Sequence, residues 1–286
     1  MANYLNSGNF PANVNALKSG FINMFAPARP WVSTMWNASP YTGSGIVPNG
    51  SNQLGYQDLN GGNGSSTIQS APGKVGLFLN GFSTETHTSP HYVGQWCFGV
   101  QDKSYAGNDR PWANGKWLHA AARIRVHSQY FGNACGYSYM VLILHDLKSK
   151  ISVQLLYALT DSRSNIGSGA WAAVSQEAGG TIAFAQVGVT NGEAANGYLE
   201  NWGANYRRGS GNSVDDFWFA IGPQHLQKLL DKARTNPGCA GLSTDSGDYV
   251  LEGVAFQPEL GNLSGQPTNI PGQFGWTLES CNVVSQ

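Results

Sequence analysis

One stretch of the sequence, residues 121–129, places side chains that could do chemistry at alternating positions. In a β-strand, side chains point alternately to the two faces of the sheet. Four polar residues would therefore share one face: Arg123, Arg125, His127 and Gln129. Two guanidinium groups beside an imidazole suit a carboxylate or a polyhydroxylated chain as ligand. The alternative is that these residues have no ligand and form the solvent-exposed outer face of an antiparallel sheet, where their charges keep the surface hydrated.

These residue types match the needs of β-elimination from a uronic-acid polymer. That reaction requires an Arg, Gln or Asn to neutralise the carboxylate and a His or Tyr to abstract a proton. His127 and Tyr130, together with Tyr139 on what we expect to be the adjoining strand, could supply the base beside Arg123 and Arg125. The sequence thus favours a lyase over a hydrolase.

A single carboxyl group interrupts the apolar segment 249–256. Alternation would turn Glu252 toward the same side as Val250, Val254 and Phe256. A carboxyl among apolar neighbours has a raised pKa, which suits a general acid, whereas the alternative is a buried ion pair with a sheet arginine. Glycoside hydrolysis needs a second carboxylate, and the sequence spacing does not choose among three candidates. These are Asp161, Asp216 and Glu259.

Nine tryptophans are too many for one core, so some must lie at the surface. Trp112 and Trp202 occur in loop-like contexts where an indole could stack on a sugar, with Asn201 and Gln129 as polar ligand contacts. Their alternative role is to seal the ends of the domain. Trp218 is expected to alternate into the core together with Asp216 and Ala220.

Composition points to an uncharged, hydroxyl-rich partner. Sixteen Lys and Arg balance seventeen Asp and Glu, giving a net charge of −1, which argues against nucleic acid as a partner. Charged residues make up 12% of the chain, about half the usual share, while Gly, Trp, Tyr and Phe are plentiful. A polysaccharide or other glycan fits this surface, although extracellular β-proteins often share this composition whatever they bind.

The sequence predicts neither a cofactor nor a metal site. Glu85, His87 and His91 lie close together, but their spacing matches no usual zinc signature. Serine-hydrolase elbows and phosphate-binding glycine loops are both missing from the sequence. We expect no membrane span, because no run of about 18 apolar residues occurs. We expect a secreted protein whose signal peptide is not part of this chain.

Four widely spaced cysteines favour two disulfides over a zinc site. Proximity along the chain suggests the pairs Cys97–Cys135 and Cys239–Cys281.

The pattern of apolar and turn residues predicts an all-β, two-sheet antiparallel sandwich of jelly-roll type with one late helix at 222–234. We expect a single domain, 1–286, with 1–73 as an irregular N-terminal wrap and 74–286 as the sandwich core. A helix from about Asn13 is expected within the wrap. Eight segments read as strands: 74–82, 92–101, 117–130, 137–146, 151–161, 181–190, 215–221 and 249–258.

A sandwich with many strands and a polar, aromatic-bearing face resembles the concanavalin-like jelly rolls, over residues 74–258. This group includes lectins, glucanases and polysaccharide lyases. The resemblance implies a secreted enzyme that degrades polysaccharide. A non-catalytic glycan-binding module is one alternative. Another is a structural jelly roll that self-assembles through residues 1–70, which would make the protein a homo-oligomer.

Overall fold

The computed structural model describes two thirds of the chain, including most of its C-terminal half. The described residues are 2–5, 32–36, 47–48, 54–57, 66–71, 74–80, 94–101, 105, 110–130, 134–163, 171–177, 180–189, 197–205, 207–208, 211–262 and 273–285. For the described residues among 2–101, 127–130, 134, 171–182, 208, 260–262, 273, 279–282 and 284, the description is limited to the backbone. The predicted helix near Asn13 and the group Glu85, His87 and His91 lie outside the described residues.

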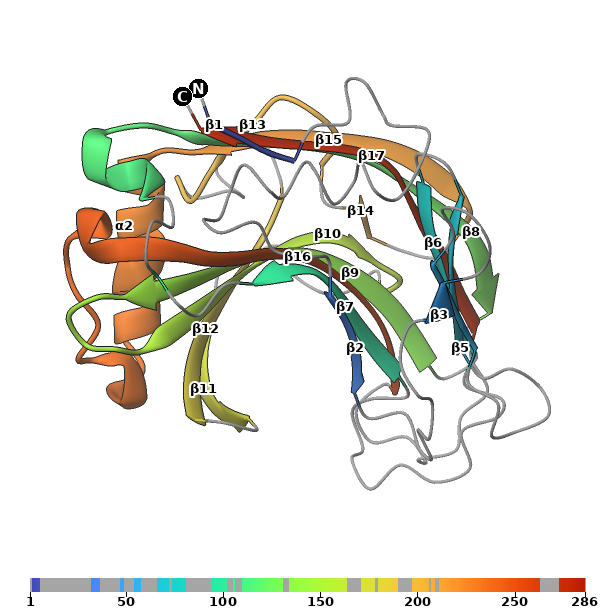
Figure 1. The fold of residues 1–286 in the computed structure, drawn as a ribbon, viewed down its shortest axis with the longest axis horizontal. Helices are drawn as coiled ribbons and strands as arrows, with labels where there is room; N and C mark the ends of the chain where they lie inside the picture. Colours follow the sequence, from blue (N-terminus) through green and yellow to red (C-terminus); the bar gives the residue numbers. More distant parts are fainter. Residues whose placement is uncertain are drawn as a thin grey trace.

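The described strands form two sheets that pack face to face, which confirms the predicted sandwich (Figure 1). Sheet A has the order β13 (Glu200–Asn201), β15 (Ser213–Ile221), β8 (Leu118–Tyr130), β17 (Gln273–Ser285), β6 (Lys74–Asn80), β5 (Ser66–Ala71), β4 (Leu54–Gln57), β3 (Val47–Pro48). In addition, β1 (Ala2–Leu5) pairs with β17.

Sheet B lies beneath sheet A in the same view and bends so that its outer face is concave (Figure 1). Its order is β11 (Trp171–Glu177), β12 (Gly180–Gly188), β10 (Ser152–Asp161), β9 (Ala134–Asp146), β16 (Tyr249–Asn262), β7 (Gly94–Gln101), β2 (Val32–Trp36). The short β14 (Arg207–Arg208) also pairs with β10. Pairing is antiparallel except that β12 and β14 run parallel to β10.

The eight predicted strands all occur, with shifted ends, but the structure contains further strands that were not predicted. The central strand β17 lies beyond the last predicted segment, and β11, β13 and β14 fall between predicted strands. Segments of the expected irregular wrap add β1 to β5 to the two sheets. These strands form because their backbones pair with strands that are distant in sequence. The local pattern of residues does not reveal such pairing.

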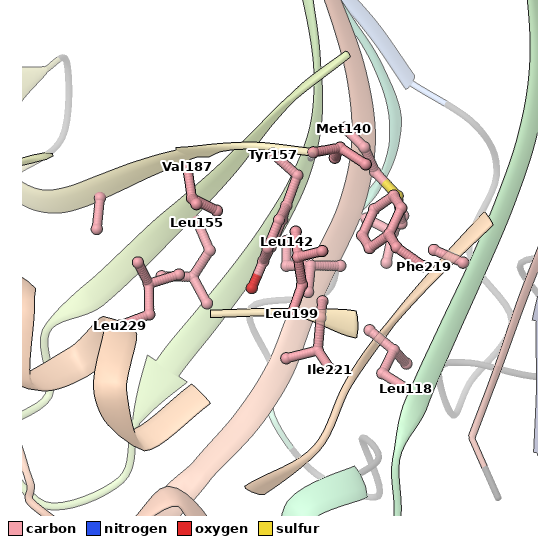
Figure 2. Packing of buried hydrophobic residues seen from close by; sticks show 14 of the residues in the cluster. Leu118, Met140, Leu142, Leu155, Tyr157, Val187, Leu199, Phe219, Ile221 and Leu229 are labelled. Atoms are coloured by element: carbon pink, nitrogen blue, oxygen red, sulfur yellow. The ribbon is translucent and has the colours of Figure 1, made fainter. Parts of the chain in front are cut away.

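The main core fills the space between the sheets. Figure 2 shows Leu118, Phe219 and Ile221 from sheet A facing Met140, Leu142, Leu155 and Tyr157 from sheet B. Helix α2 (Pro223–Arg234) closes one end and adds four fully buried side chains: Leu226, Leu229, Leu230 and Ala233. Pro223 occupies the first turn, where its missing N–H costs nothing, and the helix matches the prediction. Three short 3₁₀ turns flank these elements: η2 (Pro111–Asn114), η4 (Pro237–Cys239), η5 (Ser246–Asp248).

The structure supports neither predicted disulfide, and Cys135 and Cys239 are both buried. Cys97 lies on β7 and Cys135 on β9, and β16 runs between these strands. Two strand spacings amount to about 9.5 Å, beyond the roughly 7 Å that a disulfide spans between Cα atoms. Cys239 lies in η4 beside α2, whereas Cys281 lies on β17 in sheet A. Nearness in sequence did not mean nearness in space.

Among the residues described, no helix is both long and apolar enough to span a membrane.

Candidate functional site

Strand β8 carries Arg123 and Arg125 on the outer face of sheet A, as predicted. Both side chains are exposed, while Ile124 and Val126 on the same strand are buried. The alternation of side chains thus holds from Leu118 to Val126.

A β-bulge at His127 ends this alternation. Trp276 pairs with Val126, but the preceding Gly275 pairs with Ser128, so His127 is an extra residue in β8. Gln129 then pairs with Phe274, whose side chain lies in the core. The register position of Gln129 is therefore on the core side, opposite to the arginines. The side chains of His127, Gln129 and Tyr130 lie outside the described part of the structure.

Arg123 binds Asp216 of the neighbouring strand β15 in a bidentate ion pair. Its Nε donates to Oδ1 and its Nη2 to Oδ2 of Asp216, both at 2.7 Å. The hydrogen bond from Arg123 lowers the pKa of Asp216 below its usual value. The two side chains remain 50% and 64% exposed, so the pair is open to solvent.

Tyr139 and Glu252 do not join this face. Tyr139 lies on β9 and Glu252 on β16, both in sheet B, whereas the neighbours of β8 are β15 and β17. The expectation that Tyr139 adjoins the arginine-bearing strand is wrong. Strand order in the sandwich, which the sequence does not state, separates the predicted catalytic residues between two sheets.

A second bulge changes the direction of Glu252. The pairing of β16 with β9 shifts between Leu251 and Gly253, so Glu252 is the extra residue. Leu251, Val254 and Phe256 all lie in the main core. Glu252 therefore does not share a face with Val254 and Phe256, as simple alternation had predicted.

Glu252 is 1% exposed and has polar partners. Its Oε2 accepts hydrogen bonds from Ser152 Oγ at 2.7 Å and from the Tyr105 hydroxyl at 3.2 Å. His145 Nδ1 lies 3.9 Å from the same oxygen, and its ring stacks on Tyr105. Burial lowers the pKa of His145, although the charge of Glu252 opposes this shift. Tyr105 adopts a φ of 58°, a strained conformation that these contacts hold in place.

The two tryptophans that were predicted to stack on a sugar, Trp112 and Trp202, differ sharply in their exposure to solvent. Trp112 is 3% exposed and donates from Nε1 to the carbonyl of Ile221, so it belongs to the core and not to a ligand surface. Trp202 is 49% exposed, as a surface aromatic should be.

Trp218 is 53% exposed, so its predicted place in the core is wrong. Its neighbours Phe217 and Phe219 are each 1% exposed and point into the core instead. Asp216, on the same face as Trp218, was the signal that could have shown this, because an Asp rarely alternates into an apolar core.

Asn201 uses its side chain to build a loop. Its Nδ2 donates to the Ala204 carbonyl and to Asn205 Oδ1, and its Oδ1 accepts from the Gly203 amide. The amide group predicted to contact ligand thus fixes the segment that carries Trp202.

The outer face of sheet B brings together two carboxylates whose pairing the sequence could not predict. Asp161 on β10 and Glu259 on β16 both pair directly with Tyr137 on β9. Tyr137 belongs to a second apolar cluster, built from sheet B and separate from the main core. Directly paired residues point to the same side, so Asp161, Tyr137 and Glu259 form one row across the concave face.

Further polar groups hold these carboxylates. Arg163 donates to both oxygens of Asp161 and lies over the Tyr137 ring, 5.0 Å from its centroid. Burial alone would lower the pKa of Arg163. The hydrogen bonds and the electrostatic attraction to Asp161 outweigh this effect, so the pKa of Arg163 lies above its usual value. Gln257 Nε2 donates to Glu259 Oε1 at 2.6 Å. Asp161 and Glu259 are 2% and 3% exposed.

No protein-family model and no curated protein sequence matches the chain. Similar solved structures exist, all at low sequence identity. The xyloglucanase domain of NopAA, an effector from Sinorhizobium fredii, in complex with cellobiose, has 10% identity and a TM-score of 0.36, over 89% of this chain and 98% of that one.

Two further similar structures are a cellulase and a xylanase. A cellulase derived from an enzyme of Rhodothermus marinus has 10% identity and a TM-score of 0.38, over 90% of this chain and 100% of that one. The family 11 xylanase from Neocallimastix patriciarum has 9% identity and a TM-score of 0.34, over 89% and 100%. Similarity at this level carries no conclusion about activity.

Proposed function

We propose that this protein hydrolyses the glycosidic bonds of a polysaccharide and that Asp161 and Glu259 are its catalytic carboxylates. The observation that carries the proposal is their common pairing with Tyr137 on the concave face of sheet B. The polar, nearly uncharged composition supports a neutral sugar polymer as substrate. Because such polymers occur mainly outside cells, we also propose that the protein acts after secretion.

The spacing of the two carboxylates is compatible with hydrolysis. Their strands are separated by β9, so their backbones are about 9.5 Å apart at a strand spacing of about 4.8 Å. Carboxyl groups about 6.5–9.5 Å apart support inversion, and groups about 5–5.5 Å apart support retention. If the side chains of Asp161 and Glu259 extend in parallel, their carboxyl groups keep about this separation, which suits inversion. In inversion a water molecule enters between one carboxylate and the sugar.

The neighbours of each carboxylate suggest different roles. Asp161 is held as the anion of an ion pair with Arg163, which suits the base that activates water. Glu259 accepts from the neutral amide of Gln257, which stabilises a carboxylate less than the guanidinium of Arg163 does, so of the two carboxyls Glu259 is assigned as the acid that protonates the leaving oxygen. The ring of Tyr137 between them offers an apolar surface for the sugar.

Hydrolysis is favoured over the predicted elimination because the residues predicted to carry out elimination are divided between the two sheets. Arg123 is bound to Asp216 on sheet A, whereas Tyr139 lies on sheet B. Both carboxyls proposed for hydrolysis are buried, so substrate must displace the atoms that cover them. We therefore expect activity on polymers, whose long chains contribute binding energy, to exceed activity on small aryl glycosides.

The test is incubation with neutral and uronic polysaccharides while reducing ends and ultraviolet absorbance are followed. We expect reducing ends without the absorbance of unsaturated products. Glu259→Gln and Asp161→Asn should each lower the rate by at least about 100-fold, as expected for removing a general acid or base. Asp231→Asn, which changes an exposed carboxylate on helix α2, is the matched control and should keep the rate within about threefold. Unsaturated products, or full rates in both sheet B variants, would refute the assignment.

A further inference from the structure

The outer face of sheet A carries exposed aromatic rings that the proposed hydrolytic residues on sheet B do not use. Trp202 and Trp218 are 49% and 53% exposed, and His119 lies beside them. We call the set Trp202, Trp218 and His119 the aromatic strip. We propose that the aromatic strip binds a neutral sugar chain by stacking, at a site separate from the hydrolytic one.

The three rings form a continuous surface. The rings of His119 and Trp202 are stacked, with centroids 5.9 Å apart and an angle of 10° between planes. Trp202 and Trp218 have centroids 5.5 Å apart and planes inclined at 54°. Two inclined indoles can contact successive sugar rings of a twisted chain, since each indole offers an apolar face and a polar N–H edge.

The backbone holds Trp202 tightly against β15. The amides of Trp202 and Gly203 both donate to the Trp218 carbonyl, at 2.8 and 3.1 Å, and Ala204 N donates to the Asp216 carbonyl at 2.7 Å. A Cβ at Gly203 would lie 2.4 Å from Trp218 N, so only glycine permits this approach. A platform fixed in this way loses little conformational freedom on binding.

Polar groups continue the strip along the same face. Trp218 pairs with Ala121, and the next outward pair along the strands is Asp216 with Arg123. Outward pairs on two strands succeed one another at about 7 Å, so the carboxylate and guanidinium lie next to the indoles. Their bidentate bond leaves donors and acceptors for sugar hydroxyls while their charges cancel.

The aromatic strip is too small for a stable protein interface. An indole side chain offers up to roughly 250 Å², so two half-exposed indoles present about 250 Å² together, against about 800 Å² per partner in a specific complex. Burial lowers the pKa of His119, although Glu200 opposes the shift, so the imidazole is neutral at neutral pH. An uncharged stacking surface of this size fits a neutral sugar chain better than a protein or a polyanion.

The experiment measures binding of cello-, xylo- and manno-oligosaccharides to the full chain by titration calorimetry and tryptophan fluorescence. Glu259→Gln serves as the background, so that no substrate is consumed and the result does not depend on whether the protein hydrolyses glycans. We expect Trp202→Ala and Trp218→Ala each to weaken binding of at least one neutral series by about 10-fold. Trp218→Tyr keeps a ring and should weaken it by only about threefold.

Two controls make the result specific. Val214 is 45% exposed on the same strand but lies outside the aromatic strip, and Val214→Ala should leave binding unchanged. Gly203→Ala keeps both indoles but displaces their backbone, and it should weaken binding. Circular dichroism confirms that each variant folds.

The proposal fails if no neutral series binds, or if the Trp202 and Trp218 variants bind as well as the background. It also fails if these variants change only the oligomeric state in sedimentation experiments, because the strip would then be a contact between copies of the chain.

Discussion

Arg163 forms a bidentate ion pair with Asp161, which lies two residues earlier in the chain. Its Nε donates to Oδ1 at 2.9 Å and its Nη2 to Oδ2 at 2.6 Å, and the Asp161 side chain is 1% exposed. A carboxylate buried to this degree depends on its partner for stability, because an uncompensated buried charge is costly.

Arg163→Ala should therefore destabilise the protein by about 3 kcal/mol at pH 7, as measured by urea unfolding. Arg163→Lys should recover only part of this loss, since an ammonium cannot make the bidentate contact. Arg234 is a matched control, because its side chain is also 27% exposed but its partner Asp231 is 53% exposed. Arg234→Ala should cost less than about 1 kcal/mol. Equal losses in the two alanine variants would contradict the proposed dependence.

Tyr157 places its hydroxyl in the apolar core without a hydrogen-bond partner. Figure 2 shows the ring among leucine side chains, and the residue is 0% exposed. Burial without a partner raises the pKa of Tyr157 far above its usual value. Tyr157→Phe should raise the free energy of unfolding by about 1 kcal/mol, because the cost of a buried unpaired hydroxyl disappears. A lower stability of the Phe variant in thermal and urea unfolding would show that the hydroxyl is satisfied.

His225 links acid pH to the stability of α2. Its Nδ1 accepts a hydrogen bond from the Gly222 amide at 3.0 Å, which a proton on Nδ1 would abolish. Burial lowers the pKa of His225, although Glu200 opposes the shift. As the pH falls through the usual histidine pKa of about 6.5, the unfolded chain takes up the proton first, so stability is lost until the folded pKa is reached.

His225→Gln keeps an acceptor for Gly222 without a titrating group. We expect its stability at pH 8 to lie within about 1 kcal/mol of the original protein and its loss between pH 7 and 5 to be smaller. The remaining loss comes from His119 and His145, whose pKa values are also lowered mainly by burial. Identical pH profiles for the two proteins, measured by urea unfolding at each pH, would contradict this role.

The exposed pair of Arg123 and Asp216 should stabilise the fold only slightly. A double-mutant cycle with Arg123→Ala and Asp216→Ala should give a coupling below about 1 kcal/mol that weakens further in high salt. Because the pKa of Asp216 is lowered, this small contribution is present at neutral pH and is lost as the pH falls through the lowered pKa. A coupling that stayed large in high salt would contradict the open, solvated arrangement.

Local pattern was enough for several features of this protein. Alternation from Leu118 to Val126 assigned Arg123 and Arg125 to an outer face, and the apolar spacing with Pro223 at its start located α2. These features depend on neighbours within a few residues, which is the range over which a sequence pattern carries information.

The candidate sites required the tertiary structure. One extra residue at His127 and another at Glu252 each reverse the faces of the later residues in the same strand, and a bulge forms in response to the partner strand. Asp161 and Glu259 are 98 positions apart by their residue numbers, yet both pair with Tyr137.

The sequence by itself determined the residue types, the balance of charge and most of the strands. Only the folded chain decided which strands became neighbours, which face each aromatic ring occupied and which carboxylates stood in one row. The physical reason is that strand pairing joins segments of any separation through backbone hydrogen bonds, which are alike for every residue type except proline.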